Sequence, residues 1–329
     1  MKKLSRTKLW VIMALCMLVL FVGAAAFFFN NETKLDGQKS AVTVAMAADN
    51  NYTYPTVVSI TSLMTNAKNT THYDIHIMVP HDFTEENKQK LLNLPKKFEN
   101  RCQINLIDMQ NSYESANVAG HIRTPLTTPA YYRLSLSSLL PEVDKIIWVD
   151  GDTLIFEDLT NLINISMDGL YYKGFLDYPY PMESFNFKGD HYICSGVMLI
   201  NLKKLREDNM EPKIETFIKE NNDKLVQHDQ TVRITIYFIL FQDNIGALPI
   251  KYGIFNFTDM EMVNDYSNRL VAKNKYTKNE ILQAYEKPAI LHYVYKPWEQ
   301  NEVNRKDLWW EYAAKTDYFD EIKTYYGLA

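Results

Sequence analysis

The stretch Lys145-Ile146-Ile147-Trp148-Val149-Asp150-Gly151-Asp152 decides the fold. Its unbroken apolar run is typical of a strand that is buried on both faces of a sheet. Such sheets carry their sites just beyond the carboxyl ends of their strands, which is where Asp150 and Asp152 stand. Carboxylate oxygens suit Mg²⁺ or Mn²⁺, and Gly151 permits a tight turn and the close approach of a ligand. The alternative is a solvated turn, because D-x-D triplets also arise by chance in a chain this rich in aspartate.

The composition describes a globular protein with a sizeable core. The chain has 329 residues, of which 47% are hydrophobic, enough for one large α/β domain or two small ones. A net charge of -5 argues against a nucleic-acid-binding surface. The three cysteines, Cys16, Cys102 and Cys194, form neither a disulfide framework nor a zinc motif.

The N-terminal segment predicts a membrane anchor. Four basic side chains in residues 1–8 precede residues 9–29, which carry no charge. An apolar helix of ~20 residues spans a bilayer, whereas a cleaved signal peptide usually has an apolar core of ~7–15 residues. The basic residues place the N-terminus in the cytoplasm. We therefore predict a cytoplasmic tail (1–8), a transmembrane signal anchor (9–29), a stem (30–40) and a folded domain (41–329); cleavage after the small residues at 23–26 is the alternative.

The first part of the folded domain alternates strands and helices. Strands are expected at 41–46, 72–79 and 102–107, with helices at 54–66 and after Asp82. This order is typical of a parallel, doubly wound sheet that binds a nucleotide. No G-x-G-x-x-G follows the first strand. Polar side chains occur there instead, and they serve either as ligand contacts or as an ordinary loop: Ala48-Asp49-Asn50-Asn51-Tyr52.

The remaining elements bring further polar residues to strand and helix ends. We expect helices at 131–140, 156–163, 308–313 and from Asp229-Gln230 to about residue 240. We expect strands at 170–176, which delivers Asp177, at 196–202, entered through Cys194 and Ser195, and at 288–291, which ends in His292.

Taken in order, several short motifs resemble glycosyltransferase family 8 over about residues 42–315. The motifs are Ala48-Asp49-Asn50-Asn51-Tyr52, Tyr132-Arg133-Leu134, Asp150-Gly151-Asp152, Ser195-Gly196-Val197-Met198-Leu199-Ile200-Asn201-Leu202, Asp229-Gln230, and His292 with Lys296-Pro297-Trp298. Glycogenin, bacterial lipopolysaccharide galactosyl- and glucosyltransferases and Golgi xylosyltransferases belong to this family. The resemblance implies a single catalytic α/β domain of the GT-A type, with helices on both faces of a mostly parallel twisted sheet. It also implies a UDP-sugar donor, Mn²⁺ (or Mg²⁺) as the metal, and retention of the anomeric configuration.

The resemblance also implies roles for particular residues. The metal ligands would be Asp150, Asp152 and His292. The uridine and ribose contacts would be Asp49, Asn51 and Tyr52, with Ala48, Gly151 and Ser195 also lining the donor site. Arg133 and Asp177 would contact the donor sugar, Gln230 would lie beside the anomeric carbon, and Lys296 would meet the leaving diphosphate. Two departures affect these roles: a cysteine at 194 where relatives often have asparagine, and the short Tyr293-Val294-Tyr295 segment.

The function expected is transfer of glucose, galactose or xylose from a UDP-sugar to a glycan, glycolipid or glycoprotein. The alternatives are a membrane-anchored sugar-nucleotide- or glycan-binding protein without turnover, and a haloacid-dehalogenase-type phosphatase. The phosphatase motif needs a glycine after its second aspartate, whereas Thr153 follows Asp152 here. The anchor implies a Golgi type II protein in a eukaryote, or a protein of the cell-envelope inner membrane in a bacterium.

Overall fold

Residues 41–329 form one compact unit. The computed structural model describes residues 41–114, 128–177, 193–225, 244–257, 259–272, 275–299 and 303–327. The predicted anchor with its tail and stem, and Gln230 with the helix that follows it, lie outside these residues. Within the described ranges, no helix has the length and apolar character needed to cross a bilayer.

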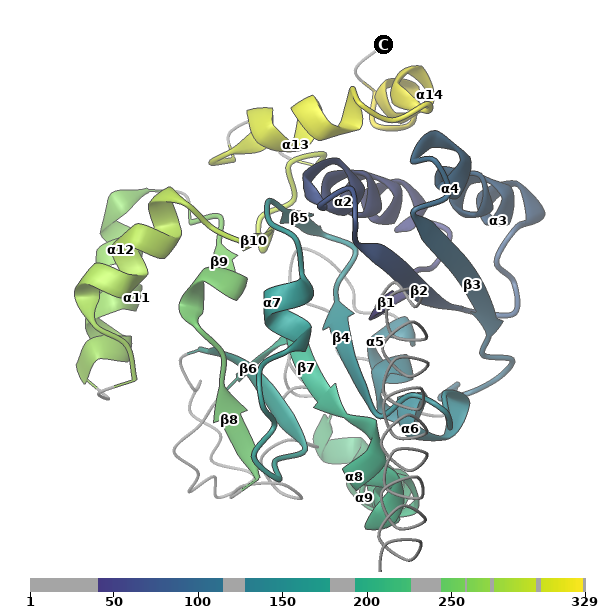
Figure 1. Ribbon diagram of the computed structural model, residues 1–329, viewed down its shortest axis with the longest axis vertical. Helices are drawn as coiled ribbons and strands as arrows, with labels where there is room; N and C mark the ends of the chain where they lie inside the picture. Colours follow the sequence, from purple (N-terminus) through teal and green to yellow (C-terminus); the bar gives the residue numbers. More distant parts are fainter. Residues whose placement is uncertain are drawn as a thin grey trace, which may run out of the picture. The chain divides into compact units, whose positions relative to one another are not determined.

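The core of the unit is a seven-stranded sheet with the order β3-β2-β1-β4-β7-β6-β8 (Figure 1). Its strands are β1 (Ala41–Ala47), β2 (His72–Val79), β3 (Cys102–Asp108), β4 (Lys145–Val149), β6 (Tyr172–Leu176), β7 (Ile193–Asn201) and β8 (Ile245–Ala247). The pairs β2–β3, β1–β2 and β1–β4 are parallel, as is β6–β8. Among the described strands of this sheet, β7 alone runs antiparallel to its neighbours, β4 and β6. The predicted mixed α/β fold is confirmed.

The centre of the sheet explains why its chemistry gathers at one edge. Strands β4 and β7 are buried along nearly their whole length, so the sheet is covered on both faces there. Because β1 and β4 are parallel, with Ala45 opposite Trp148, their carboxyl ends meet at the same edge. Because β7 is antiparallel, with Val197 opposite Val149, it is the start of β7 that lies at this edge.

A second, three-stranded sheet turns the chain back after Asp152. It has the order β5-β10-β9, from β5 (Thr153–Ile155), β9 (Ile254–Phe255) and β10 (Ile290–His292). The antiparallel β5–β10 pair puts His292 opposite Thr153, next to Asp152 in the chain. The predicted helix at 156–163 is therefore wrong in its first half. Phe156 instead donates its N–H to the Ala289 carbonyl (2.8 Å), and only Thr160–Ile163 is helical.

The helices connect and cover the strands. They are α2 (Thr53–Asn66), α3 (Glu85–Leu92), α4 (Leu94–Lys97), α5 (Pro129–Tyr132), α6 (Leu136–Leu139), α7 (Thr160–Ile163), α8 (Leu202–Glu207), α9 (Met210–Leu225), α11 (Met260–Ala272), α12 (Lys278–Glu286), α13 (Lys306–Ala313) and α14 (Phe319–Tyr325). The helix expected at 131–140 is divided into α5, a 3-10 turn (Arg133–Ser135) and α6.

Helix α2 fixes the strand that follows Asp152. The helix is almost entirely buried, and its serine side chains bond to β5 instead of to water. Ser62 Oγ accepts a hydrogen bond from the Ile155 N–H (2.8 Å), and Ser59 Oγ lies 2.9 Å from Thr153 Oγ1. Buried polar groups need such partners, so α2 and β5 specify each other's position.

The Asp158 carboxylate joins α7 to the start of β2. It accepts hydrogen bonds from the Lys68 N–H (3.0 Å), the Tyr73 hydroxyl (3.2 Å) and the Thr160 N–H (3.0 Å). Burial acts to raise the pKa of Asp158, but the hydrogen bonds to the carboxylate outweigh it and lower the pKa to about 2. Such a group stabilises the fold above its unfolded pKa, and this stabilisation is lost as the pH falls towards 2.

We expect Asp158→Asn to lower the free energy of unfolding by about 1–2 kcal/mol at pH 7. The difference from the wild type should shrink as the pH falls from about 4 to 2, because the wild-type carboxylate is then protonated as well. Urea unfolding of both proteins across this pH range measures it. Asp144→Asn is the control, since the Asp144 carboxylate pairs with Arg206 at an exposed position. A difference that does not depend on pH would contradict the electrostatic origin.

Candidate active site

The structure brings together the three residues predicted as metal ligands. One potential ligand atom from each of Asp150, Asp152 and His292 lies within 4.8 Å of the other two. His292 Nε2 is 3.1 Å from Asp152 Oδ1 and 3.9 Å from Asp150 Oδ2. Asp150 follows β4, Asp152 precedes β5 and His292 ends β10, so the two sheets together assemble the cluster.

Two observations show that this cluster fits a divalent cation. Asp152 Oδ1 is buried and accepts no hydrogen bond of acceptable geometry, although His292 Nε2 is close. A buried carboxylate oxygen is costly unless a cation lies beside it, and either a protonated His292 or a divalent ion can supply that cation. In addition, a Cβ on Gly196 would lie 2.2 Å from the His292 ring and 3.0 Å from Asp150 Oδ2. The start of β7 can therefore approach the cluster this closely only with glycine.

The Asp152 carboxylate is flanked by cationic groups. Lys296 Nζ, which is buried, donates to Asp152 Oδ2 (2.5 Å) and to the Tyr293 carbonyl (2.7 Å). Burial acts to raise the pKa of Asp152, but Lys296 and His292 hold it below its usual range. Burial acts to lower the pKa of His292, but Asp152 outweighs it and raises that pKa to about 10. The site thus stabilises positive charge next to Asp152.

Asp150 is oriented by two donors on its other oxygen. Its Oδ1 accepts hydrogen bonds from Arg133 Nη2 (3.0 Å) and Trp148 Nε1 (2.7 Å), which leaves Oδ2 directed at His292. The Arg133 guanidinium is buried, lies 4.4 Å from the Trp148 ring centre, and also donates to the carbonyls of Ala130 (3.0 Å) and Ser195. Arg133 therefore positions Asp150, and its predicted contact with a donor sugar stays a prediction.

The loop between β1 and α2 (Ala48–Tyr52) lies at the same edge of the sheet. Asp49 Oδ1 accepts hydrogen bonds from the backbone N–H groups of Asn51 (3.0 Å) and Tyr52 (2.9 Å), which shape the loop. Burial raises the pKa of Tyr52, and the nearby Asp152 carboxylate raises it further, so the Tyr52 hydroxyl stays protonated. Ala48 is buried and Asn51 is exposed.

The other predicted site residues fall in different places. Gly151 is buried, and a Cβ there would lie 2.5 Å from Thr56 Oγ1, so its nearest neighbour is α2. Ser195 is buried at the start of β7 and presents its carbonyl to Arg133. Asp177 is half-buried and directly follows β6. Gln230 lies outside the described residues.

Asn256 is a site residue that the sequence did not reveal. It is fully buried, and its side-chain amide forms a pair of hydrogen bonds with the backbone of Tyr295: Nδ2 to the carbonyl (2.7 Å) and Oδ1 from the N–H (3.1 Å). Its own N–H donates to the His292 carbonyl (3.3 Å). Asn256 thus holds both ends of the short segment that separates His292 from Lys296. The pairing of β9 with β10 brings Asn256 next to this segment, and no local sequence pattern predicts that pairing.

Cys194 contributes to the orientation of the histidine ring. Its Sγ lies 3.7 Å from His292 Nδ1, which leaves Nε2 facing the two carboxylates. A partner on one ring nitrogen commonly fixes which nitrogen faces a metal. The cysteine at position 194, where relatives often have asparagine, thus lies next to the cluster.

Comparison with known proteins identifies the family. The family model described as glycosyl transferase family 8 matches residues 43–302. The chain belongs to glycosyl transferase family 8. The expectation from the motifs is confirmed, and membership makes the protein a glycosyltransferase.

Relatives within family 8 are distant in sequence. General stress protein A of Bacillus subtilis is 25% identical over 293 residues, covering 83% of this chain and 93% of that protein. Glycosyltransferase GlyE of Streptococcus pneumoniae is 27% identical over 173 residues, which cover 52% of this chain and 37% of the relative. The chain thus aligns with well under half of GlyE.

Solved structures share the fold. An active-site glutamine-to-glutamate mutant of LgtC superposes with a TM-score of 0.67 at 20% identity, covering 84% of this chain and 96% of that one. The bifunctional glycosyltransferase WbbM gives a TM-score of 0.67 at 22% identity, covering 88% of this chain and 52% of its own. The mixed α/β fold with its seven-stranded sheet therefore resembles the GT-A glycosyltransferases.

Proposed function

We propose that this family 8 glycosyltransferase is metal-dependent and transfers glucose, galactose or xylose from a UDP-sugar to a glycan, glycolipid or glycoprotein, with retention of configuration. The cluster of Asp150, Asp152 and His292 beside the β1–α2 loop carries the proposal. A galactosyltransferase of the same fold, LgtC, has been solved with donor and acceptor sugar analogues, which supports a similar pair of substrates here.

In the proposed mechanism, Asp150, Asp152 and His292 would hold Mn²⁺ or Mg²⁺. When bound, the ion supplies Lewis-acid stabilisation of the charge that develops on the leaving diphosphate. Arg133 keeps the Asp150 carboxylate oriented, and the Lys296 ammonium provides a fixed positive charge for the same diphosphate. Asp49, Asn51 and Tyr52 bind the uridine, with Ala48, Gly151 and Ser195 lining the donor site.

The transfer step exchanges one C1–O bond for another. The bond from the anomeric carbon to the diphosphate breaks, the acceptor oxygen bonds to the same face, and the acceptor's proton passes to the leaving diphosphate. The Gln230 carbonyl oxygen stabilises the oxocarbenium-like centre, and Arg133 and Asp177 orient the sugar. This route retains configuration without a covalent intermediate. The solved LgtC mutant with an altered active-site glutamine supports a role for this residue type.

The first experiment measures UDP release by the purified full chain with Mn²⁺ and a panel of UDP-glucose, UDP-galactose, UDP-xylose and UDP-N-acetylglucosamine. We expect slow, metal-dependent release from one donor without an acceptor. Gln230→Ala should slow transfer by on the order of 10²–10³-fold while the affinity for UDP is unchanged. Loss of UDP binding in this variant would contradict the role proposed for Gln230.

The rival function is a sugar-nucleotide- or glycan-binding protein without turnover. The presence of Lys296 together with Asp150, Asp152 and His292 argues against it, because a site without turnover would tolerate the loss of these residues. UDP binding without release of UDP from any donor, with and without acceptors, would favour the rival.

We also propose that residues 9–29 anchor the enzyme in a membrane. The support is the uncharged length of this segment and the basic residues before it. A Golgi type II orientation follows in a eukaryote and an inner-membrane location in a bacterium. Fractionation of the full chain beside a chain without residues 1–40 tests the attachment; equal recovery in the soluble fraction would contradict it.

A further inference from the structure

The C-terminal helix α14 contacts the β1–α2 loop and the first turn of α2. Tyr325 donates its hydroxyl to Asn51 Oδ1 (3.3 Å). Glu321 Oε2 accepts the Tyr54 hydroxyl (3.1 Å), and the rings of Tyr54 and Tyr325 are 5.2 Å apart. The match to the family 8 model ends at residue 302, so α14 is an element that the family model does not cover.

The aromatic residues beside α14 extend this contact to Tyr52. The Tyr326 ring lies 6.0 Å from the Trp298 ring, which is 6.2 Å from the Tyr52 ring in an edge-on arrangement. Asn51 and Tyr52, two of the three residues proposed to bind uridine, are thus linked to the C-terminal segment, directly or through Trp298.

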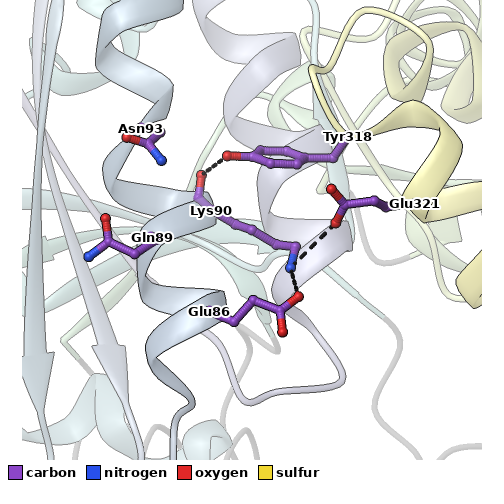
Figure 2. Close-up of a pocket in the computed structure, with 6 residues that line it drawn as sticks. All are labelled: Glu86, Gln89, Lys90, Asn93, Tyr318 and Glu321. Carbon is purple, nitrogen blue, oxygen red and sulfur yellow. Dashed lines mark hydrogen bonds and ion pairs between the residues drawn. The ribbon is translucent and has the colours of Figure 1, made fainter.

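A charged network holds α14 against α3 (Figure 2). The Lys90 ammonium, on a side chain only 6% exposed, pairs with Glu86 in α3 and with Glu321 in α14 (3.4 Å). The Tyr318 hydroxyl donates to the Lys90 carbonyl (3.3 Å). The groove between these residues measures about 460 Å³, and its one ammonium lies between two carboxylates. Because the Lys90 ammonium pairs with a carboxylate from each helix, the network links α14 to α3.

The bond from Tyr325 determines how Asn51 presents its amide. A carboxamide has an acceptor oxygen at one end and a donor NH₂ at the other. When the oxygen is bound to Tyr325, the NH₂ end is left for a ligand. A uridine offers matching acceptors in its base carbonyls and ribose oxygens. The Tyr325 ring is 52% exposed, so its hydroxyl is not needed to fill the core.

We propose that Tyr325 is a positioning residue for the donor nucleotide, which acts through Asn51 by holding its amide with the NH₂ group directed at the uridine. The proposal rests on the UDP-sugar function proposed above. It makes α14 the outer support of the nucleotide site and gives the C-terminal segment a role in substrate affinity.

The test is the affinity of the full chain for UDP in the presence of Mn²⁺, measured by titration calorimetry, together with the kinetics of UDP release. Tyr325→Phe is expected to weaken UDP binding by about three- to tenfold and to raise the KM for the donor while kcat is unchanged. Its melting temperature should equal that of the wild type, because the hydroxyl lies on an exposed ring.

The controls separate positioning from packing. Tyr318→Phe removes a hydroxyl that joins α14 to α3 and not to the loop, and should leave UDP affinity unchanged. If Tyr325 acts through Asn51, the double variant Tyr325→Phe/Asn51→Ala binds UDP no more weakly than Asn51→Ala alone. If the losses of UDP affinity in the two single variants add up in the double variant, or if Tyr325→Phe binds UDP as tightly as the wild type, the role proposed for Tyr325 is wrong. The proposed donor is not affected by either result. If the wild-type protein does not bind UDP, the proposed UDP-sugar donor is wrong, and the role proposed for Tyr325 is then wrong as well.

Discussion

Replacement of Asp152 by asparagine is expected to lower Mn²⁺ affinity at least about 100-fold and sugar transfer by on the order of 10³-fold or more. The substitution removes a carboxylate whose Oδ1 is buried and lies 3.1 Å from His292 Nε2. Mn²⁺ titration followed by electron paramagnetic resonance reports binding, and UDP release from the preferred donor reports activity.

The same substitution also affects stability, and a second variant separates the two effects. Asp152→Asn keeps an amide oxygen that can accept from the buried Lys296 ammonium, but it removes the negative charge that compensates this cation, at a cost of about 3–5 kcal/mol. Asp150→Asn costs less, because Asp150 is more exposed than Asp152 and the Arg133 guanidinium keeps the Ala130 and Ser195 carbonyls. Its amide oxygen still accepts from Arg133 and Trp148, while an NH₂ group replaces the oxygen that faces His292. Full Mn²⁺ affinity in a folded Asp150→Asn variant would contradict the metal site. Asp168→Asn, at an exposed carboxylate paired with Lys173, is the matched control.

Arg133→Lys is expected to weaken Mn²⁺ binding about 10- to 100-fold and to lower kcat/KM by a similar factor. The guanidinium reaches Asp150, the Ser195 carbonyl and the Ala130 carbonyl at once. A lysine ammonium is a compact point charge that cannot reproduce this fork, so Asp150 loses a fixed orientation while the local charge is kept. Mn²⁺ affinity and the steady-state rates of UDP release are the measurements.

Arg206→Lys provides the control for Arg133. Arg206 also bonds to several backbone carbonyls, those of Ser137, Leu140 and Val143, at the turn before β4. Its replacement should lower the melting temperature without changing Mn²⁺ affinity. Equal Mn²⁺ affinities for Arg133→Lys and Arg206→Lys would show that Arg133 only stabilises the fold.

Much of the sheet could be predicted because the local sequence of its strands, such as an unbroken apolar run, indicates a buried strand. The run before Asp150 is apolar without a break, and it forms β4, buried on both faces at the centre of the sheet. The strand–helix–strand order of the first part likewise gives the parallel β1, β2 and β3. From those two facts alone, Asp150 and the β1–α2 loop fall at one edge of the sheet.

The direction of β7 could not be predicted in this way. An apolar run reads the same in both directions, and only its long-range pairing shows that β7 is antiparallel to β4. Because β7 is antiparallel, Gly196 near its start lies in contact with the His292 ring. Similarly, the segment after Asp152 has no decisive local pattern. Its pairing with β10 makes Thr153–Ile155 a strand, directly before the segment 156–163 where a helix was expected.

For the charged residues Arg133 and Lys296, the sequence predicted the location at the site correctly but did not predict their contacts within the protein. Resemblance assigned Lys296 to a leaving diphosphate and Arg133 to a sugar, and both residues do lie at the cluster. Their contacts within the protein, to Asp152 and Asp150, depend on side-chain distances that no sequence motif encodes. Gln230 and the anchor at 9–29 lie outside the described residues, so those expectations stay predictions.

The buried position of Asn256 has a consequence for how the enzyme is produced. Asn256-Phe257-Thr258 matches the N-x-T acceptor pattern for N-linked glycosylation. Yet the Asn256 amide is fully buried and bonded to Tyr295, so a glycan attached there during synthesis would prevent β9 from docking beside β10. Modification of this sequon and assembly of the cluster of Asp150, Asp152 and His292 are therefore mutually exclusive. A chain made in a secretory pathway must bury Asn256 before a glycan is attached to it. In a bacterial cytoplasm, folding does not compete with glycosylation of this sequon.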